Sequence, residues 1–520
     1  MNGANGSEST RRRIVRHATR DACPPAARRR RRRPTLFGPF RPARALTVAA
    51  LAMATTLVSC AVNPATGKRQ FTLFSEAQEI EMGREYDPQI VAEMGLYPDD
   101  TLQEYIQELG SRLAAQSERP HLPWTFRILD DPIVNAFALP GGYIYVTRGI
   151  LAHLGSEAEL AGVLGHEIGH VTARHSVGRM STQQLAQLGL ALGTALRPDL
   201  EGIAGVASAG LQLAFLKYGR DDERQADELG LRYMLRGNYD PREMPQVFDM
   251  LDRVTRDAGG SGTPEWLSTH PNPGDRRERM ERLVAQHGAG TATAVVGRES
   301  FLRRLDGLVY GTNPREGFFR GSRFLHPDLE FQLDFPEGWQ TANLKNAVIA
   351  ASPEQDAMIQ LTLAQGSDPE AAARAFFGQQ GLVAGTIGST RIGGLPAVSG
   401  EFRAAAQGGA IRGLATFVAH RNAVFQLLAF AAEPAFADHD RTLRGSLASF
   451  ARLTDPKALA VQPLRIQTVT LDRAMTLAEF HQRYPSAIPL DKVALLNHAE
   501  PGTRFEKGAV LKRVVGEPAI

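Results

Sequence analysis

His166-Glu167-Ile168-Gly169-His170 is the stretch that decides the fold of this 520-residue chain. Residues four apart lie on one face of a helix, so the two imidazoles can bind the same metal ion with a carboxylate beside them. This pattern is typical of zinc hydrolases. A helix is favoured because Ser156 and Glu159 fit an S-x-x-E capping box. Apolar residues then recur at helical spacing, at Leu160, Val163, Leu164 and Val171.

A third ligand is needed to distinguish a zinc site from a chance match. With 13 histidines, composition alone would produce H-E-x-x-H in roughly two such chains in a hundred. In one large group of zinc hydrolases the third ligand is a Glu on a later helix, and an Asp four residues on supports one histidine. Glu223 and Asp227 fit this arrangement, although an acidic stretch alone is more typical of a solvated helix face. Together the two stretches predict a zinc site of His166, His170 and Glu223, supported by Asp227.

This ligand set predicts hydrolytic chemistry. Three protein ligands leave one coordination position on zinc for a water, whose pKa the metal lowers towards neutrality. Glu167 lies beside one ligand but points off the ligand face, so we expect it to take the water's proton and pass it to the leaving amine. His175 and Arg220 are candidates for stabilising the oxyanion, and a structural role is the alternative for each.

The chain resembles peptidase family forty-eight of the metallopeptidases, the group of HtpX, the CAAX prenyl proteases and BepA-like enzymes. Residues Asn135 to Val146 resemble the strand that precedes the active-site helix and lies along the substrate cleft. H-E-I-G-H-V-T-A-R-H, from His166 to His175, and E-x-x-A-D, from Glu223 to Asp227, match the family's motifs. Trp266 to Pro271 resembles a segment of BepA-like members. The four motifs lie between about residues 70 and 285 and agree in order.

The resemblance implies a mainly helical, zincin-like (gluzincin) endopeptidase domain with one zinc ion per chain. The backbone of Asn135, Ala136, Phe137 and Ala138 is expected to pair with an extended substrate, which gives affinity for unfolded segments with little sequence demand. The substrates expected are misfolded or misassembled envelope proteins.

His270 resembles a histidine that is able to occupy the open zinc position. We therefore expect a self-inhibited enzyme that opens when a client or partner draws this loop away. The alternative is a surface histidine in a proline-rich loop.

The first 59 residues are predicted to be an export leader. The net charge of +3 misleads, because residues 1–44 hold 13 Arg against Glu8 and Asp21, so the remainder is net acidic. A nucleic-acid-binding arm is the alternative for the arginine run, but an uncharged apolar stretch of signal-peptide length follows it. We therefore expect no nucleic-acid partner.

Leu57-Val58-Ser59-Cys60 resembles the bacterial lipobox, in which the Cys thiol takes a diacylglycerol. Cys60 would then begin the mature protein and anchor it to a membrane. The other cysteine, Cys23, lies in the leader, so no disulfide is expected, and a buried cysteine after an ordinary signal is the alternative. Ala61 follows Cys60, a pattern that favours the outer membrane. We expect the periplasmic face of the outer membrane in a two-membrane bacterium.

About 460 residues remain after the leader, enough for two or three domains. Residues 60–288 form the predicted zinc metallopeptidase domain, with strand character only at 126–146. We expect helices at 76–94 with a break at Pro88, and at 102–116, 181–196 and 202–216. The apolar segments 188–196 and 203–216 are predicted to be core helices or a cleft cover rather than membrane spans.

Residues 313–455 predict an α+β accessory domain with a sheet covered on one face. Its role is binding or positioning, or packing alone. Strand candidates lie at 329–335, 359–363 and 424–430, and helix candidates at 371–377 and 439–450.

Residues 464–520 weakly resemble a LysM peptidoglycan-binding module, with the order strand, helix, helix, strand. The D-T-L signature appears only as Met475-Thr476-Leu477, and Tyr484 to Pro489 is an atypical insert. A structural cap is therefore the alternative to a peptidoglycan ligand, and no tetratricopeptide period follows the peptidase region. Two other functions stay open for the chain: a non-proteolytic chaperone or assembly lipoprotein, and a wall-binding lipoprotein with a vestigial peptidase domain.

Overall fold

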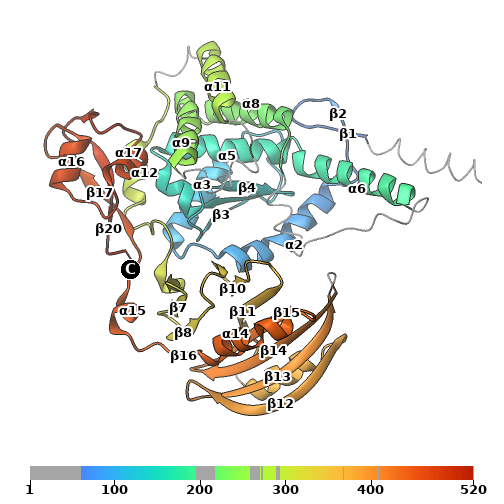
Figure 1. Cartoon of the computed structure of the whole chain (residues 1–520). Coiled ribbons are helices and arrows are strands. Elements are labelled where there is room, and N and C mark those ends of the chain that lie inside the picture. The colour runs from blue at the N-terminus through green and yellow to red at the C-terminus, as the bar shows by residue number, and fades with distance from the viewer. Residues whose placement is uncertain are drawn as a thin grey trace, which may run out of the picture. The chain divides into compact units, whose positions relative to one another are not determined.

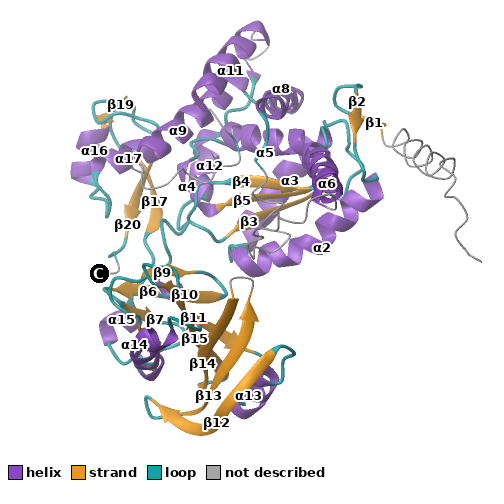
Figure 2. Cartoon of the chain, turned by 45° about the vertical axis from the view of Figure 1, so that its right-hand side comes forward, coloured by secondary structure: helices purple, strands orange, loops and turns teal. Residues whose placement is uncertain are grey.

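The computed structural model describes residues 60–194, 217–257, 270, 273–287, 293–366, 368–406 and 409–518 (Figure 1). A helical region with a two-stranded and a three-stranded sheet comes first, a β-rich region follows, and a small C-terminal unit ends the chain (Figure 2). The predicted leader and the predicted helix at 202–216 lie outside the described residues. Among the helices that are described, none is both long and apolar enough to cross a membrane.

Helix α5 (Glu157–Thr172) is the core of the helical region, and every residue from Ala158 to Thr172 is buried. Ser156 caps it, because its Oγ accepts a hydrogen bond from the backbone N–H of Glu159. The predicted capping box is only half formed. The Glu159 carboxylate accepts from the N–H of Gly155 at 2.6 Å and pairs with His498 of the C-terminal unit at 3.3 Å.

Pro88 does not break the first helix, contrary to the sequence prediction. Asp87 accepts hydrogen bonds from Arg127 and Tyr145 just before the proline, and Ile90 is fully buried just after it. These contacts on both sides hold one continuous helix, although a proline removes a backbone donor. The other α-helices described in the helical region are α2 (Glu76–Met94), α3 (Asp100–Ala114), α4 (Arg148–His153), α6 (His175–Thr194), α8 (Arg220–Arg236), α9 (Met244–Asp257), α11 (Pro273–His287) and α12 (Arg298–Arg304).

The three-stranded sheet of the helical region has the order β3-β5-β4, so β4 (Ala136–Leu139) is an edge strand. It pairs antiparallel with β5 (Tyr143–Thr147), which runs parallel to β3 (Thr125–Leu129). The turn between β4 and β5 contains Gly141 and Gly142 at φ +84° and +103°, a backbone region that side chains disfavour. Strand β4 also contacts α5, the helix that carries the His166–His170 motif (Figure 1).

The β-rich region contains a seven-stranded sheet and a four-stranded sheet. Helix α13 packs on one face of the large sheet, against Val424 of β15, and α14 packs on the other face, against Phe425 and Leu427. The prediction of a sheet covered on one face was therefore wrong, because the alternation along β15 is apolar on both sides. The large sheet has the order β12-β13-β14-β15-β11-β10-β9 and the small one β16-β8-β7-β6.

The elements of this region, in chain order, are β6 (Phe318–Arg320), β7 (Arg323–His326), β8 (Phe331–Asp334), β9 (Gln340–Asn343), β10 (Ala347–Ala351), β11 (Ala357–Ala364), α13 (Pro369–Phe377), β12 (Leu382–Ile392), β13 (Leu395–Ala406), β14 (Gly409–His420), β15 (Ala423–Ala432), α14 (Phe436–Ala448), β16 (Ala451–Arg452) and α15 (Pro456–Ala460). Each strand and helix predicted at 313–455 has a counterpart among them.

The C-terminal unit has its two longer strands paired antiparallel, with two helices between them in sequence. Its Ile466 and Val510 belong to the same buried cluster as α5, so the unit packs directly on the helical region. Lys512 is fully buried and donates hydrogen bonds to the carbonyls of Ala152 and Leu154, just before α5. A peptidoglycan ligand for this unit stays a prediction. Its elements are β17 (Arg465–Thr470), β18 (Met475–Thr476), α16 (Leu477–Arg483), α17 (Leu490–Leu496), β19 (Arg504–Phe505) and β20 (Val510–Val515).

Candidate metal centre

Helix α5 holds His166 and His170 one turn apart, as the motif predicts, and both side chains are buried. Their Nε2 atoms lie 3.0 Å apart, so both imidazoles are directed at one point. Burial lowers the pKa of His166 to about 3, which keeps the imidazole neutral in spite of its contact with Asp227. A neutral imidazole is the form that binds a metal.

Close packing of α5 against α8 brings the acidic residues to the histidines. A Cβ on Gly169 would lie 3.0 Å from the carbonyl oxygen of Ala226, and one on Gly230 would lie 2.9 Å from the backbone nitrogen of His166. The two backbones therefore approach as near as glycine allows. Because Glu223 and Asp227 lie on this face of α8, they reach the histidines directly.

Glu223 lies in the first turn of α8 and has its carboxylate between the two histidines. Its Oε1 is 3.5 Å from His170 Nε2, and its Oε2 is 3.6 Å from His166 Nε2. Burial alone would raise the pKa of Glu223, but the charges of His270 and Arg276 and hydrogen bonds outweigh it and hold the pKa well below its usual value. The carboxylate is therefore ionised, as a metal ligand must be.

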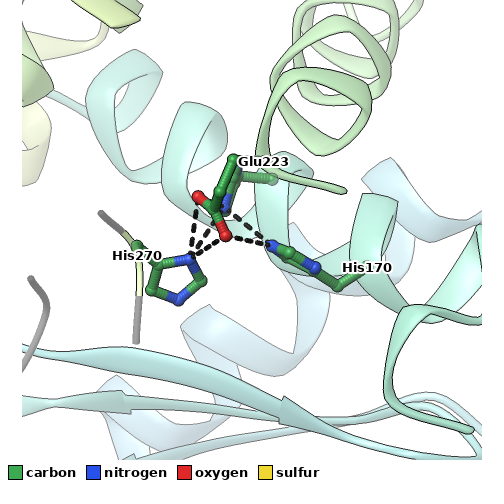
Figure 3. A group of neighbouring side chains, drawn as sticks. His170, Glu223 and His270 are labelled. Carbon is green, nitrogen blue, oxygen red and sulfur yellow. Dashed lines mark hydrogen bonds and ion pairs between the residues drawn. The ribbon is translucent and has the colours of Figure 1, made fainter. Parts of the chain in front are cut away.

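The His270 ring faces the Glu223 carboxylate from the side opposite His170 (Figure 3). It is fully buried, and its Nδ1 lies 2.9 Å from Glu223 Oε1 and 3.3 Å from His166 Nε2. One ligand atom each from His166, His170, Glu223 and His270 lies within 4.8 Å of the others. Three imidazole nitrogens and one carboxylate oxygen around one point are a donor set suited to zinc.

Two further side chains orient the histidines from behind. Asp227 Oδ1 lies 3.0 Å from His166 Nδ1, and His175 Nδ1 lies 2.9 Å from His170 Nδ1. His175 in turn contacts Gln225 at 2.7 Å. Such contacts fix the ring orientation of ligand histidines. His175 thus supports a ligand, which agrees with the structural alternative for this residue.

Glu167 is fully buried beside the ligands, and among the described residues neither of its carboxylate oxygens has a hydrogen-bond partner. The His270 ring is near it, with Nε2 3.7 Å from Glu167 Oε1. Burial raises the pKa of Glu167 to about 7. A buried carboxylate without hydrogen bonds is costly, so its retention here favours a chemical role.

The residues predicted to pair with substrate lie beside α5, and their role stays a prediction. Ala136, Phe137 and Ala138 are in β4, and the carbonyl of Asn135 accepts a hydrogen bond from the N–H of Thr147. Cys60 is the first residue of β1 (Cys60–Val62), which pairs with β2 (Arg69–Phe71).

The sequence analysis missed two residues of the centre. The Tyr218 ring stacks on His170 with 3.9 Å between centroids, and its hydroxyl lies 2.8 Å from Ser176 Oγ. Arg276 is buried in α11 and forms ion pairs with Glu223 and Asp227 at 2.8 and 2.6 Å. One sequence signal pointed to Arg276: it lies in the first turn of a helix, where a positive charge opposes the helix dipole.

Residues 100–284 match Peptidase family M48. The beta-barrel assembly-enhancing protease of Yersinia pestis is 34% identical over 222 residues, which cover 41% of this chain and 45% of that protein. The protein of the same name from Escherichia coli K12 is 32% identical over 233 residues, or 42% and 47% of the two chains. The mitochondrial metalloendopeptidase OMA1 of Arabidopsis thaliana is 36% identical over 187 residues, or 36% of each chain.

The chain thus spans less than half the length of these relatives. The matched residues include α5 and α8, and so the two helices that carry His166, His170 and Glu223. Together with the buried His166, His170, Glu223 and His270 group, the match shows that residues 100–284 form a metallopeptidase domain of peptidase family M48.

Proposed function

We propose that this chain is a zinc-dependent endopeptidase that hydrolyses misfolded or misassembled envelope proteins at the periplasmic face of the outer membrane. The observation that carries the peptidase part is the convergence of His166, His170 and Glu223 on one point, with the buried Glu167 carboxylate beside it. We assign the metal to the first three residues and the base to Glu167.

Zinc held by His166, His170 and Glu223 would supply a Lewis acid that acidifies a water and polarises the scissile carbonyl. Glu167 accepts the proton of the attacking water and delivers it to the leaving amine. Burial raises the pKa of Glu167, and a raised pKa makes this carboxylate a better proton acceptor. Asp227 and His175 keep the two ligand imidazoles in the orientation that the reaction needs.

The substrate class is supported by the edge strand β4. Strand β4 lies at the edge of its sheet and is buried in this structure, so an extended chain would pair with its backbone once this edge is uncovered, which suits unfolded polypeptide of varied sequence. The names of two relatives, which refer to β-barrel assembly, favour envelope proteins as clients. These observations favour a quality-control peptidase over a vestigial domain.

Replacing Glu167 with Gln tests the mechanism, because the amide cannot accept the proton while all metal donors remain. We expect a folded, zinc-loaded protein whose cleavage of a casein-like unfolded substrate is at least ~10²-fold slower. Zinc content and cleavage rate are measured on the same preparation.

Glu278→Gln is the matched control, since this glutamate lies on α11 and is exposed. Its cleavage rate should equal that of the wild type. Unchanged cleavage in zinc-loaded Glu167→Gln would remove Glu167 from the mechanism. A wild-type chain that binds the substrate and zinc but never cuts would favour the chaperone alternative.

The proposed membrane anchor is a diacylglycerol on Cys60. Each buried acyl CH₂ contributes about 0.8 kcal/mol, and a stable hold needs more than one chain. Cys60→Ser should therefore lose both palmitate label and membrane partition, whereas Cys23→Ser, in the proposed leader, should keep both. Membrane retention of Cys60→Ser, with no label in the wild type, would overturn this assignment.

A further inference from the structure

Arg276 is the one permanently charged cation that the described residues place inside the metal centre. Its side chain is about 95% buried, since only 5% of the residue's surface is exposed, and the guanidinium lies 4.7 Å from the Phe248 ring centroid. A buried guanidinium is expensive unless it is paired. Its partners therefore indicate why it is there.

The guanidinium binds two carboxylates. One belongs to Glu223, a predicted metal ligand, and the other to Asp227, which contacts the ligand His166. Nη1 lies 2.8 Å from Oε2 of Glu223. Nε and Nη2 donate to the two oxygens of Asp227 at 3.0 and 2.6 Å, and Nη2 also lies 3.4 Å from His166 Nδ1. Asp227 itself contacts His166 at 3.0 Å. One planar group thus fixes a predicted ligand and the partner of a second predicted ligand.

The metal centre has an excess of negative charge that the Arg276 guanidinium partly offsets. Glu223, Asp227 and Glu167 are all buried carboxylates, and the three neighbouring histidines can bind a metal only in their neutral form. Arg276 offsets part of this negative charge whether or not a cation is bound. A divalent metal would offset it as well, so the two cations have overlapping roles.

We propose that Arg276 is a positioning residue of the metal centre: its guanidinium locks Glu223 and Asp227 into one unit and keeps these carboxylates stable before a metal binds. Because Arg276 lies at the start of α11 and both carboxylates lie on α8, these ion pairs also hold the start of α11, six residues after His270, against α8. The inference rests on the zinc centre of the proposed function.

The test compares Arg276→Met and Arg276→Lys in the full chain. Met removes the positive charge and all the N–H donors. Lys keeps a positive charge but has no planar group that can bind two carboxylates at once. Each protein is melted after metal removal by chelator dialysis and again after one equivalent of zinc. Arg277→Met is the matched control, because Arg277 lies next to Arg276 but its ion pairs are at the surface.

Arg276→Met should lower the melting temperature of the metal-free protein by at least about 5 °C more than that of the zinc-loaded protein. The reason is that zinc replaces the lost charge in the loaded form only. Arg277→Met should shift both forms equally and little. Equal losses in the two forms of Arg276→Met, or no loss, would overturn the proposal, since ordinary packing does not depend on the metal.

The absorption spectrum of the cobalt-substituted protein reads the ligand arrangement directly. Arg276→Lys should keep more metal-free stability than Met and yet change this spectrum. A wild-type spectrum in Arg276→Lys would overturn the positioning role, and this result decides the matter if Arg276→Met does not fold. Neither readout uses cleavage, so failure of the endopeptidase proposal and failure of this one are distinguishable.

Discussion

The position of His270 bears on how the enzyme is regulated. It is fully buried against Glu223, which contradicts the surface-histidine alternative from the sequence. A fourth imidazole in the coordination position of the catalytic water would exclude that water. We therefore propose a resting enzyme that is inhibited by its own His270 and is activated when this histidine withdraws.

Removing this imidazole should activate the enzyme. If the inhibited state is favoured by about 1.4 kcal/mol, His270→Ala should raise basal cleavage of unfolded substrate roughly tenfold while keeping its zinc. The matched control is His287→Ala, an exposed histidine at the end of α11, which should change neither quantity. Loss of zinc or of activity in His270→Ala would instead make His270 an essential ligand.

At the scale of elements, the centre depends on how near α5 and α8 approach. Gly230→Ala would place a methyl group 2.9 Å from the backbone nitrogen of His166, and backbone atoms cannot move aside as a side chain can. We expect the helices to separate, with a loss of about 1–3 kcal/mol in unfolding free energy and weaker zinc binding. Denaturant melts and a competitive zinc titration measure the two effects.

Gly162→Ala is the control for this prediction, since it adds the same methyl group to a buried glycine on α5, the helix that faces α8. Its added methyl would be 3.4 Å from the sulfur of Met234, a flexible side chain. The control should bind zinc as the wild type does. Equal zinc affinity in Gly230→Ala would show that the close approach of the helices is not what positions Glu223.

The elements that the sequence predicted well are those with local signals. Helix α5 has a cap at Ser156, apolar periodicity and two ligands at fixed spacing, so its position and role followed from adjacent residues. Glu223 and Asp227 followed from the same helical spacing. The metallopeptidase prediction is confirmed by the match to peptidase family M48.

The failures arise from contacts between distant parts of the chain. Pro88 predicted a break, but tertiary contacts at Asp87 and Ile90 hold the helix. Arg276 meets Asp227 from 49 positions away, so no local pattern could pair them. The capping box failed because Glu159 contacts His498, which is more than 300 positions further along. Local propensity does not encode such pairings.

At the scale of the whole molecule, the C-terminal unit contacts the helix that carries the motif. Besides the Lys512 bonds near its start, His498 donates from Nε2 to the carbonyl of His153, and its Nδ1 lies 3.3 Å from Glu159 Oε1. Burial lowers the pKa of Lys512 to about 7. A buried lysine that donates to two carbonyls of the helical region marks a built interface between this unit and the peptidase domain, rather than a flexible tether.

The central claim is that one zinc ion, held by His166, His170 and Glu223, makes the chain a peptidase. The most direct measurement is a zinc titration of the metal-free full chain, with cleavage of an unfolded substrate recorded at each addition. We predict no cleavage without metal, a linear rise, and a plateau at one zinc per chain. Cleavage by the metal-free protein, or a saturated zinc site that cuts nothing even with His270→Ala, would contradict the account.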